Sequence, residues 1–167
     1  MGEDQTTDIL KKAILLEKKG KTFYEKVAQQ THATVVKRFF EMMANEEQNH
    51  IHILSEQYKA YQDNKEFKST EFDELHESDI AALVISKEIK SEISAADYEA
   101  AAISAAMSME ENAIKLYSDR AAAATDPNEK ALYDWLAKWE TQHLNFLADI
   151  DRELTESIWH DQNFWPF

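Results

Sequence analysis

A four-residue motif occurs twice in the chain, and its spacing constrains the fold more than any other feature. "EQNH" occupies residues 47–50 and "ETQH" occupies residues 140–143, an offset of 93. Glu17 and Tyr24 recur as Glu110 and Tyr117 at the same offset. Smaller residues repeat as well, in the pairs Ala13/Ala106, Ala28/Ala121, Ala44/Ala137, Leu54/Leu147 and, less strictly, Gly20/Ala113. The chain therefore reads as two copies of one structural unit.

Each copy is expected to be a helical hairpin. Glycine and proline occur only twice each in 167 residues, which favours helix almost everywhere. Amphipathic stretches predict four helices, at about 7–30, 33–62, 95–123 and 127–154. Asp126 is expected to cap the last helix, with Pro127 at its first position. A connector at 62–94, with a short helix expected at 79–89, and an aromatic tail at 157–167 complete what we interpret as a single domain spanning residues 1–167.

The apolar stripe of each helix is interrupted near its middle by a glutamate, or by a glutamate and a histidine. Glu17 and Glu47 flank a turn near His32, so fifteen residues of helix place both carboxylates about 22 Å from that turn. Glu110 and Glu140 repeat this arrangement around "ATDP" at 124–127. Packing the two hairpins together brings six polar side chains into one layer of the core: Glu17, Glu47, His50, Glu110, Glu140 and His143.

Four carboxylates in a helical core need positive charge. An unpaired buried charge costs several kcal/mol, and the stripes contain no lysine or arginine to pair with them. Two divalent metal ions would balance the four carboxylates, and each histidine offers a neutral nitrogen ligand. The alternative, a buried polar network that shares protons, leaves the carboxylates short of donors. The layer therefore predicts a dinuclear metal site.

This constellation resembles the ferritin-like di-iron carboxylate proteins, in which two helices give one Glu each and two give Glu-x-x-His. Within that class the chain looks most like the rubrerythrin family. The likeness lies in "ILLEKKGKTFYEKVA", "FFEMMANEEQNHIHIL", "AMSMEENAIKLYSDRAA" and "WLAKWETQHLNFL". It implies an all-α, ferritin-like four-helix bundle with a long crossover between the second and third helices.

The resemblance also implies a role for each site residue. Glu17 and Glu110 would be terminal ligands, Glu47 and Glu140 would bridge two iron ions, and His50 and His143 would bind one iron each. Tyr24 and Tyr117 match tyrosines that hydrogen-bond the ligand carboxylates. Manganese or zinc could substitute for iron, and the family resemblance further implies a homodimer.

The implied activity is that of a di-iron oxidoreductase that reduces hydrogen peroxide or dioxygen, a role in oxidative stress. Two departures bear on it. The chain has no cysteine, so it lacks a rubredoxin domain and needs a separate electron-donor protein. Ala113 stands where many rubrerythrins carry a further Glu, which leaves the usual peroxidase activity open.

Two other functions compete with this one. The first is a ferroxidase or iron-handling protein, and the second is a helical interaction module whose metal only stabilises the fold. A substrate-oxidising monooxygenase is disfavoured, because the stripes show no substrate-sized gap.

Charge and composition limit the partners. A net charge of −14 argues against binding to nucleic acid or anionic membranes. The longest apolar run, residues 80–85, is too short to span a bilayer. The absence of cysteine fits the cytoplasm, which is the location we expect. The tail, with Trp159, Phe164, Trp165 and Phe167, is expected to pack either on its own bundle or on a partner subunit.

Overall fold

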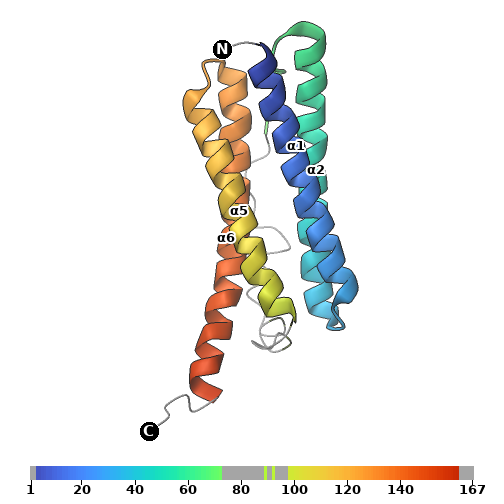
Figure 1. Cartoon of the computed structure of the whole chain (residues 1–167), viewed down its shortest axis with the longest axis vertical. Helices are drawn as coiled ribbons and strands as arrows, with labels where there is room; N and C mark the ends of the chain where they lie inside the picture. The colour runs from blue at the N-terminus through green and yellow to red at the C-terminus, as the bar shows by residue number, and fades with distance from the viewer. Residues whose placement is uncertain (1–2, 73–88, 90–91, 93–97, 162–167) are drawn as a thin grey trace.

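The structure is a computed structural model that describes residues 3–72, 89, 92 and 98–161, with the backbone alone at 3–4 and 157–161. The described residues form four long helices and no strand: α1 (Glu3–Gln30), α2 (Thr34–Asn64), α5 (Tyr98–Ala123) and α6 (Pro127–Asp161). α1 packs along α2 and α5 packs along α6, and the two hairpins lie side by side (Figure 1). The predicted all-α four-helix bundle is confirmed.

The helix ends differ from the expected ones mainly at the two ends of the chain. α1 begins at Glu3 rather than near residue 7, where acidic side chains favour a helix N-terminus. α6 begins at Pro127, and the Asp126 carboxylate accepts the Asn128 backbone N–H at 2.7 Å, which confirms the expected cap. α6 continues to Asp161 and takes up the first residues of the expected tail. It therefore extends beyond the other three helices (Figure 1).

Most of the expected connector and the end of the tail lie outside the described residues. This holds for the short helix expected at 79–89, except Ile89, and for residues 162–167. The start of the connector is described. The buried Gln57 side chain accepts a hydrogen bond from the Lys68 backbone N–H at 2.9 Å and donates one to the Lys68 carbonyl at 3.0 Å. The segment after α2 is therefore tied back onto that helix.

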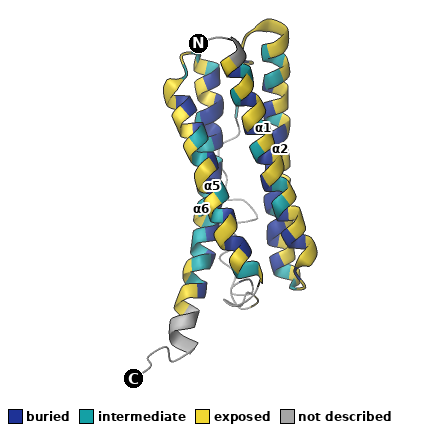
Figure 2. Cartoon of the chain, viewed as in Figure 1, coloured by how far each residue is buried: buried dark blue, intermediate teal, exposed yellow. Residues whose placement is uncertain are grey.

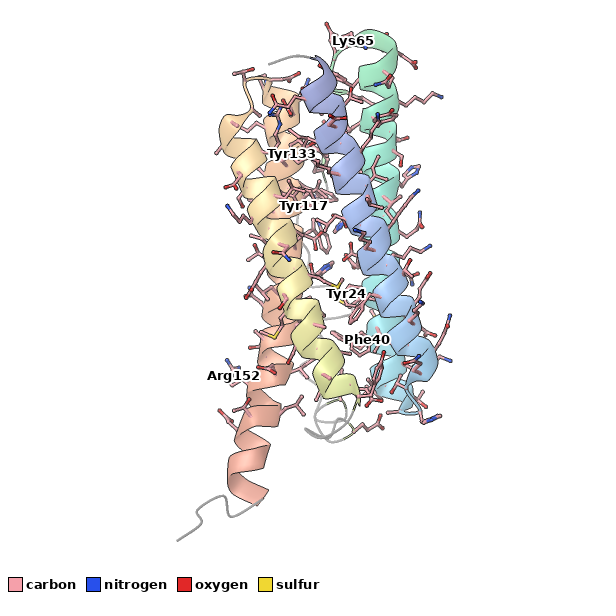
Figure 3. All side chains as sticks on the ribbon, in the orientation of Figure 1. Tyr24, Phe40, Lys65, Tyr117, Tyr133 and Arg152 are labelled. Carbon is pink, nitrogen blue, oxygen red and sulfur yellow. The ribbon has the colours of Figure 1, made fainter. Side chains whose placement is uncertain are left out.

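The core consists of two apolar clusters with a polar layer between them. One cluster contains Tyr24, Phe40 and Leu147, and the other contains Tyr117 and Tyr133. Figure 2 shows that buried residues line the facing sides of the helices, and Figure 3 shows the two pairs of labelled aromatic residues at different heights between the hairpins. All four helices contribute to the polar layer.

Among the described residues, no helix combines the length and apolarity that crossing a membrane requires.

Candidate metal centre

All six residues that the sequence placed in one layer meet between the two apolar clusters. None of them is more than 3% exposed to solvent. α1 and α5 supply one glutamate each, and α2 and α6 supply a glutamate and a histidine each: Glu17, Glu110, Glu47 with His50, and Glu140 with His143. The helical period brings each histidine under its own glutamate, because residues three apart share a helix face.

The six residues form two overlapping sets of ligand atoms. Each set has ligand atoms within 4.8 Å of one another. The first set is Glu17, Glu47, His50 and Glu140, and the second is Glu47, Glu110, Glu140 and His143. Glu47 and Glu140 belong to both sets. The geometry therefore offers two adjacent positions for an ion, with two carboxylates able to reach both.

Both imidazole rings direct Nδ1 into the layer. His50 Nδ1 lies 2.8 Å from Glu140 Oε1 and 3.2 Å from Glu17 Oε2. His143 Nδ1 lies 3.2 Å from Glu140 Oε2 and 3.5 Å from Glu47 Oε1. The two rings are stacked with centroids 5.8 Å apart. Nδ1 is thus the nitrogen that each ring presents to the carboxylates of the layer.

Two tyrosine hydroxyls cross from one hairpin to the other. Tyr24 on α1 donates a hydrogen bond to Glu110 on α5, and Tyr117 on α5 donates one to Glu17 on α1. Both tyrosines are fully buried, and both lie between the hairpins in Figure 3. Each glutamate that belongs to only one ligand set is therefore held by a tyrosine from the opposite hairpin.

Burial and neighbouring charges shift the pKa values of the groups in this layer. Burial raises the pKa of the Glu17 and Glu110 carboxyls well above its usual value, and the charge of Glu140 raises both further. Burial also opposes ionisation of Glu140, but His50 and His143 outweigh it and hold its pKa well below the usual value. The same contacts overcome the effect of burial on both imidazoles and raise their pKa. Metal binding must displace these protons, because metal ligands bind deprotonated.

The outer nitrogens of the two histidines have different surroundings, which the sequence analysis did not predict. His143 Nε2 lies 3.9 Å from a carboxylate oxygen of Glu46. His50 makes T-shaped contacts with the Trp135 and Trp139 rings, with centroids 5.5 and 6.0 Å away, and His143 makes one with Trp139 at 6.2 Å. Glu46 and Trp139 occupy equivalent positions of the repeat, each just before the glutamate of Glu-x-x-His. The difference between Glu46 and Trp139 at equivalent positions was the sequence signal that the two histidines have different surroundings.

A cavity of about 170 Å³ reaches the layer from the side where α1 and α5 face each other. All four glutamates line it, together with Gly20 and Ala113. The expectation that the stripes leave no substrate-sized gap is therefore wrong. A stripe describes the side chains along one helix, whereas this space arises where small residues on two helices meet.

The donor set fits a pair of transition-metal ions. Carboxylate oxygens and imidazole nitrogens suit iron, manganese and zinc. Four buried carboxylates share the layer with two imidazoles. A buried carboxylate oxygen of this kind is costly without a cation.

Comparison with known protein families identifies a match. The sequence model of the family Rubrerythrin matches residues 8–150. No curated protein and no solved structure matches the chain. The matched range contains all six residues of the candidate metal centre and both tyrosines that contact it.

Proposed function

Because the chain belongs to the rubrerythrin family, we propose that it is a non-haem di-iron oxidoreductase that reduces hydrogen peroxide, or dioxygen, with electrons from a separate donor. The family and the buried cluster of carboxylates and histidines fit a di-iron protein. The observation that carries the proposal is the sharing of Glu47 and Glu140 by two adjacent ligand sets. Two neighbouring ions match a reaction that needs two electrons at once.

The proposed ligands are those expected from the sequence. Glu17 and Glu110 would each bind one ion, Glu47 and Glu140 would bridge the two, and His50 and His143 would each bind through Nδ1. The contacts of each Nδ1 with the shared carboxylates support this assignment. Bound iron would supply one electron from each ion for cleavage of an O–O bond.

The tyrosines act on the carboxylates rather than on the peroxide. Burial raises the pKa of both hydroxyls, and the nearby glutamates raise it further, so they stay protonated and remain donors. By holding Glu110 and Glu17, Tyr24 and Tyr117 keep one oxygen of each carboxylate occupied and orient the other. They are therefore positioning residues.

The electron donor and the assembly complete the proposal. The chain contains no cysteine, which supports electron delivery by another protein, because a cysteine-ligated iron relay cannot form. We further propose a homodimer in the cytoplasm, active in oxidative stress, on the basis of the family. Light scattering of the purified protein would test the dimer.

Stopped-flow mixing tests the reaction. Anaerobic protein loaded with two Fe(II) per chain should be oxidised faster by hydrogen peroxide than by dioxygen, and a reduced donor should then restore it. Zinc-loaded protein, which has no redox chemistry, provides the blank. If peroxide is no faster than dioxygen, or iron leaves as a ferric precipitate, an iron-handling function replaces this one. Loaded protein that does not react at all would indicate a structural metal in an interaction module.

A further inference from the structure

The cavity beside the metal centre is larger than hydrogen peroxide requires. We name it the α1/α5 pocket; its floor is formed by the four glutamates of the centre, and its walls by Leu16, Gly20, Met109 and Ala113. Lys19 and Asn112, both exposed, stand at its rim. The pocket therefore leads from solvent, past mainly apolar walls, to the carboxylates of both ligand sets.

Two small residues create this space. Gly20 and Ala113 lie one helical turn after Glu17 and Glu110, and they occupy equivalent positions of the repeat. A Cβ atom placed on Gly20 would lie 3.5 Å from the Glu47 carboxylate carbon, an ordinary contact distance. The backbone of α1 thus closely approaches the floor, and any longer side chain at either position would enter the pocket.

The volume indicates the size of the occupant. A water molecule takes up about 30 Å³ in the liquid, so hydrogen peroxide, with two oxygens, would leave most of a 170 Å³ cavity to solvent. An apolar protein cavity of about 150 Å³ accommodates benzene. The α1/α5 pocket, whose floor also holds the proposed metal ligands, therefore has room for a peroxide group together with a small alkyl group, but not with a group as large as benzene.

The chemistry of the walls and floor indicates the class of occupant. Apolar walls favour an organic group, because burying it removes apolar surface from water. The carboxylate floor disfavours anionic ligands, whereas an organic hydroperoxide is uncharged at neutral pH. We propose that the α1/α5 pocket binds small uncharged organic hydroperoxides and directs their O–O group to the metal centre, an inference that rests on the proposed peroxide reduction.

The reaction balances without a further reactant. Reduction of ROOH would break its O–O bond, and two electrons, which a bound Fe(II) pair would supply, together with two protons taken up from solvent would give ROH and water. The separate donor would then return two electrons. The organic group is unchanged and leaves as the alcohol by the same opening.

Rates with different peroxides test the substrate class. Reduced di-iron protein is mixed anaerobically with hydrogen peroxide, tert-butyl hydroperoxide and cumene hydroperoxide. Hydrogen peroxide and tert-butyl hydroperoxide should oxidise it at rates within about tenfold of each other, whereas cumene hydroperoxide, whose aryl group exceeds the pocket, should react more slowly. Ala113→Leu, which fills the pocket, should slow tert-butyl hydroperoxide by a factor of about ten or more, since one misfitting methylene is worth that much. It should change the hydrogen peroxide rate much less.

Ala105→Leu is the matched control, because Ala105 lies on the same helix and is exposed. It should leave every rate unchanged. Circular dichroism and metal analysis of each variant show whether it folds and binds two ions. Gly20→Ala is a milder second variant, since its added carbon makes only ordinary contacts. It should slow tert-butyl hydroperoxide more than hydrogen peroxide.

A binding measurement gives a readout that does not depend on activity. tert-Butanol added to zinc-loaded protein should shift the amide NMR signals of Gly20 and Ala113, and Ala113→Leu should abolish the shift. If hydrogen peroxide oxidises the protein but the organic hydroperoxides do not, and tert-butanol causes no shift, the pocket inference is wrong and the proposed function stands. If hydrogen peroxide also fails, the proposed function itself is wrong.

Discussion

Tyr117→Phe is the substitution that most directly tests how the two hairpins hold the metal centre. It removes one buried hydroxyl, which donates to Glu17 on the opposite hairpin, and keeps the ring. Hydrogen bonds to charged groups contribute about 1.5–3 kcal/mol, and the loss of groups that orient metal ligands costs about 10–100-fold in affinity. These two figures agree, because tenfold corresponds to about 1.4 kcal/mol. We expect Tyr117→Phe to weaken the metal affinity by about 10–100-fold.

Tyr133→Phe is the control for this substitution. Tyr133 stacks on Tyr117 with ring centroids 5.9 Å apart, and its buried hydroxyl has no hydrogen-bond partner among the described residues. The equivalent residue in the other half of the repeat is Phe40, which stacks on Tyr24 in the same way. Removing this hydroxyl should therefore leave the metal affinity unchanged and the stability unchanged or slightly higher.

The assay is competition with a chelator of known affinity, using zinc or Fe(II), for the unsubstituted protein and for Tyr24→Phe, Tyr117→Phe and Tyr133→Phe. The two tyrosines that donate across the hairpins should give similar losses, because their surroundings repeat. Equal affinities for all four proteins would show that the hydroxyls do not orient the ligands. A loss in Tyr133→Phe as large as in Tyr117→Phe would show that general packing, rather than the hydrogen bond, controls affinity.

Two further predictions concern the ligands and pH. Glu47→Ala and Glu140→Ala should each abolish binding of the metal pair. Glu111→Ala, at an exposed position, is the control and should leave the metal content unchanged in metal analysis. Glu46 is unsuitable as a control because it lies 3.9 Å from His143 Nε2. Burial and neighbouring charges alter the pKa of the buried groups. A rise in pH should therefore lower the stability of the metal-free protein and raise its affinity for metal. The imidazoles of the metal centre have a raised folded-state pKa, so the stability they contribute is complete below their unfolded pKa of about 6.5 and is lost as pH rises through the folded value. In urea unfolding of chelator-treated protein, the free energy of unfolding should fall above neutral pH, whereas the metal affinity should rise over the same range. A metal-free protein that gains stability above neutral pH would contradict this.

The sequence predicted the metal centre better than its surroundings, for a physical reason. Glu47 and His50 share a helix face by period alone, and the repeat aligns Glu17 with Glu110, so the layer follows from local rules. The contact between Glu46 and His143 depends on how the second hairpin is rotated against the first. The α1/α5 pocket likewise depends on the approach of two helices that are distant in sequence. Helical period specifies neither the rotation of one hairpin against the other nor the approach of α1 to α5.

The helix ends show the same limit. Asp126 and Pro127 mark the start of α6 by local chemistry, and the structure confirms them. The end of α6 at Asp161 has no comparable local signal, because no glycine or proline lies between Leu154 and Asp161. Leu154 is the last buried apolar residue described on α6. Apolar periodicity therefore predicted that the helix ends at Leu154.

The sharing of Glu47 and Glu140 also has a mechanical consequence. Each ligand set takes three residues from one hairpin and one from the other. A bound metal pair would therefore cross-link the hairpins at mid-height, where the described protein contacts include two tyrosine hydrogen bonds. Like a disulfide, such a cross-link restricts the separation of segments far apart in the sequence. Metal removal should accordingly increase hydrogen exchange along the seam between the hairpins before it affects the contact between α1 and α2 or between α5 and α6.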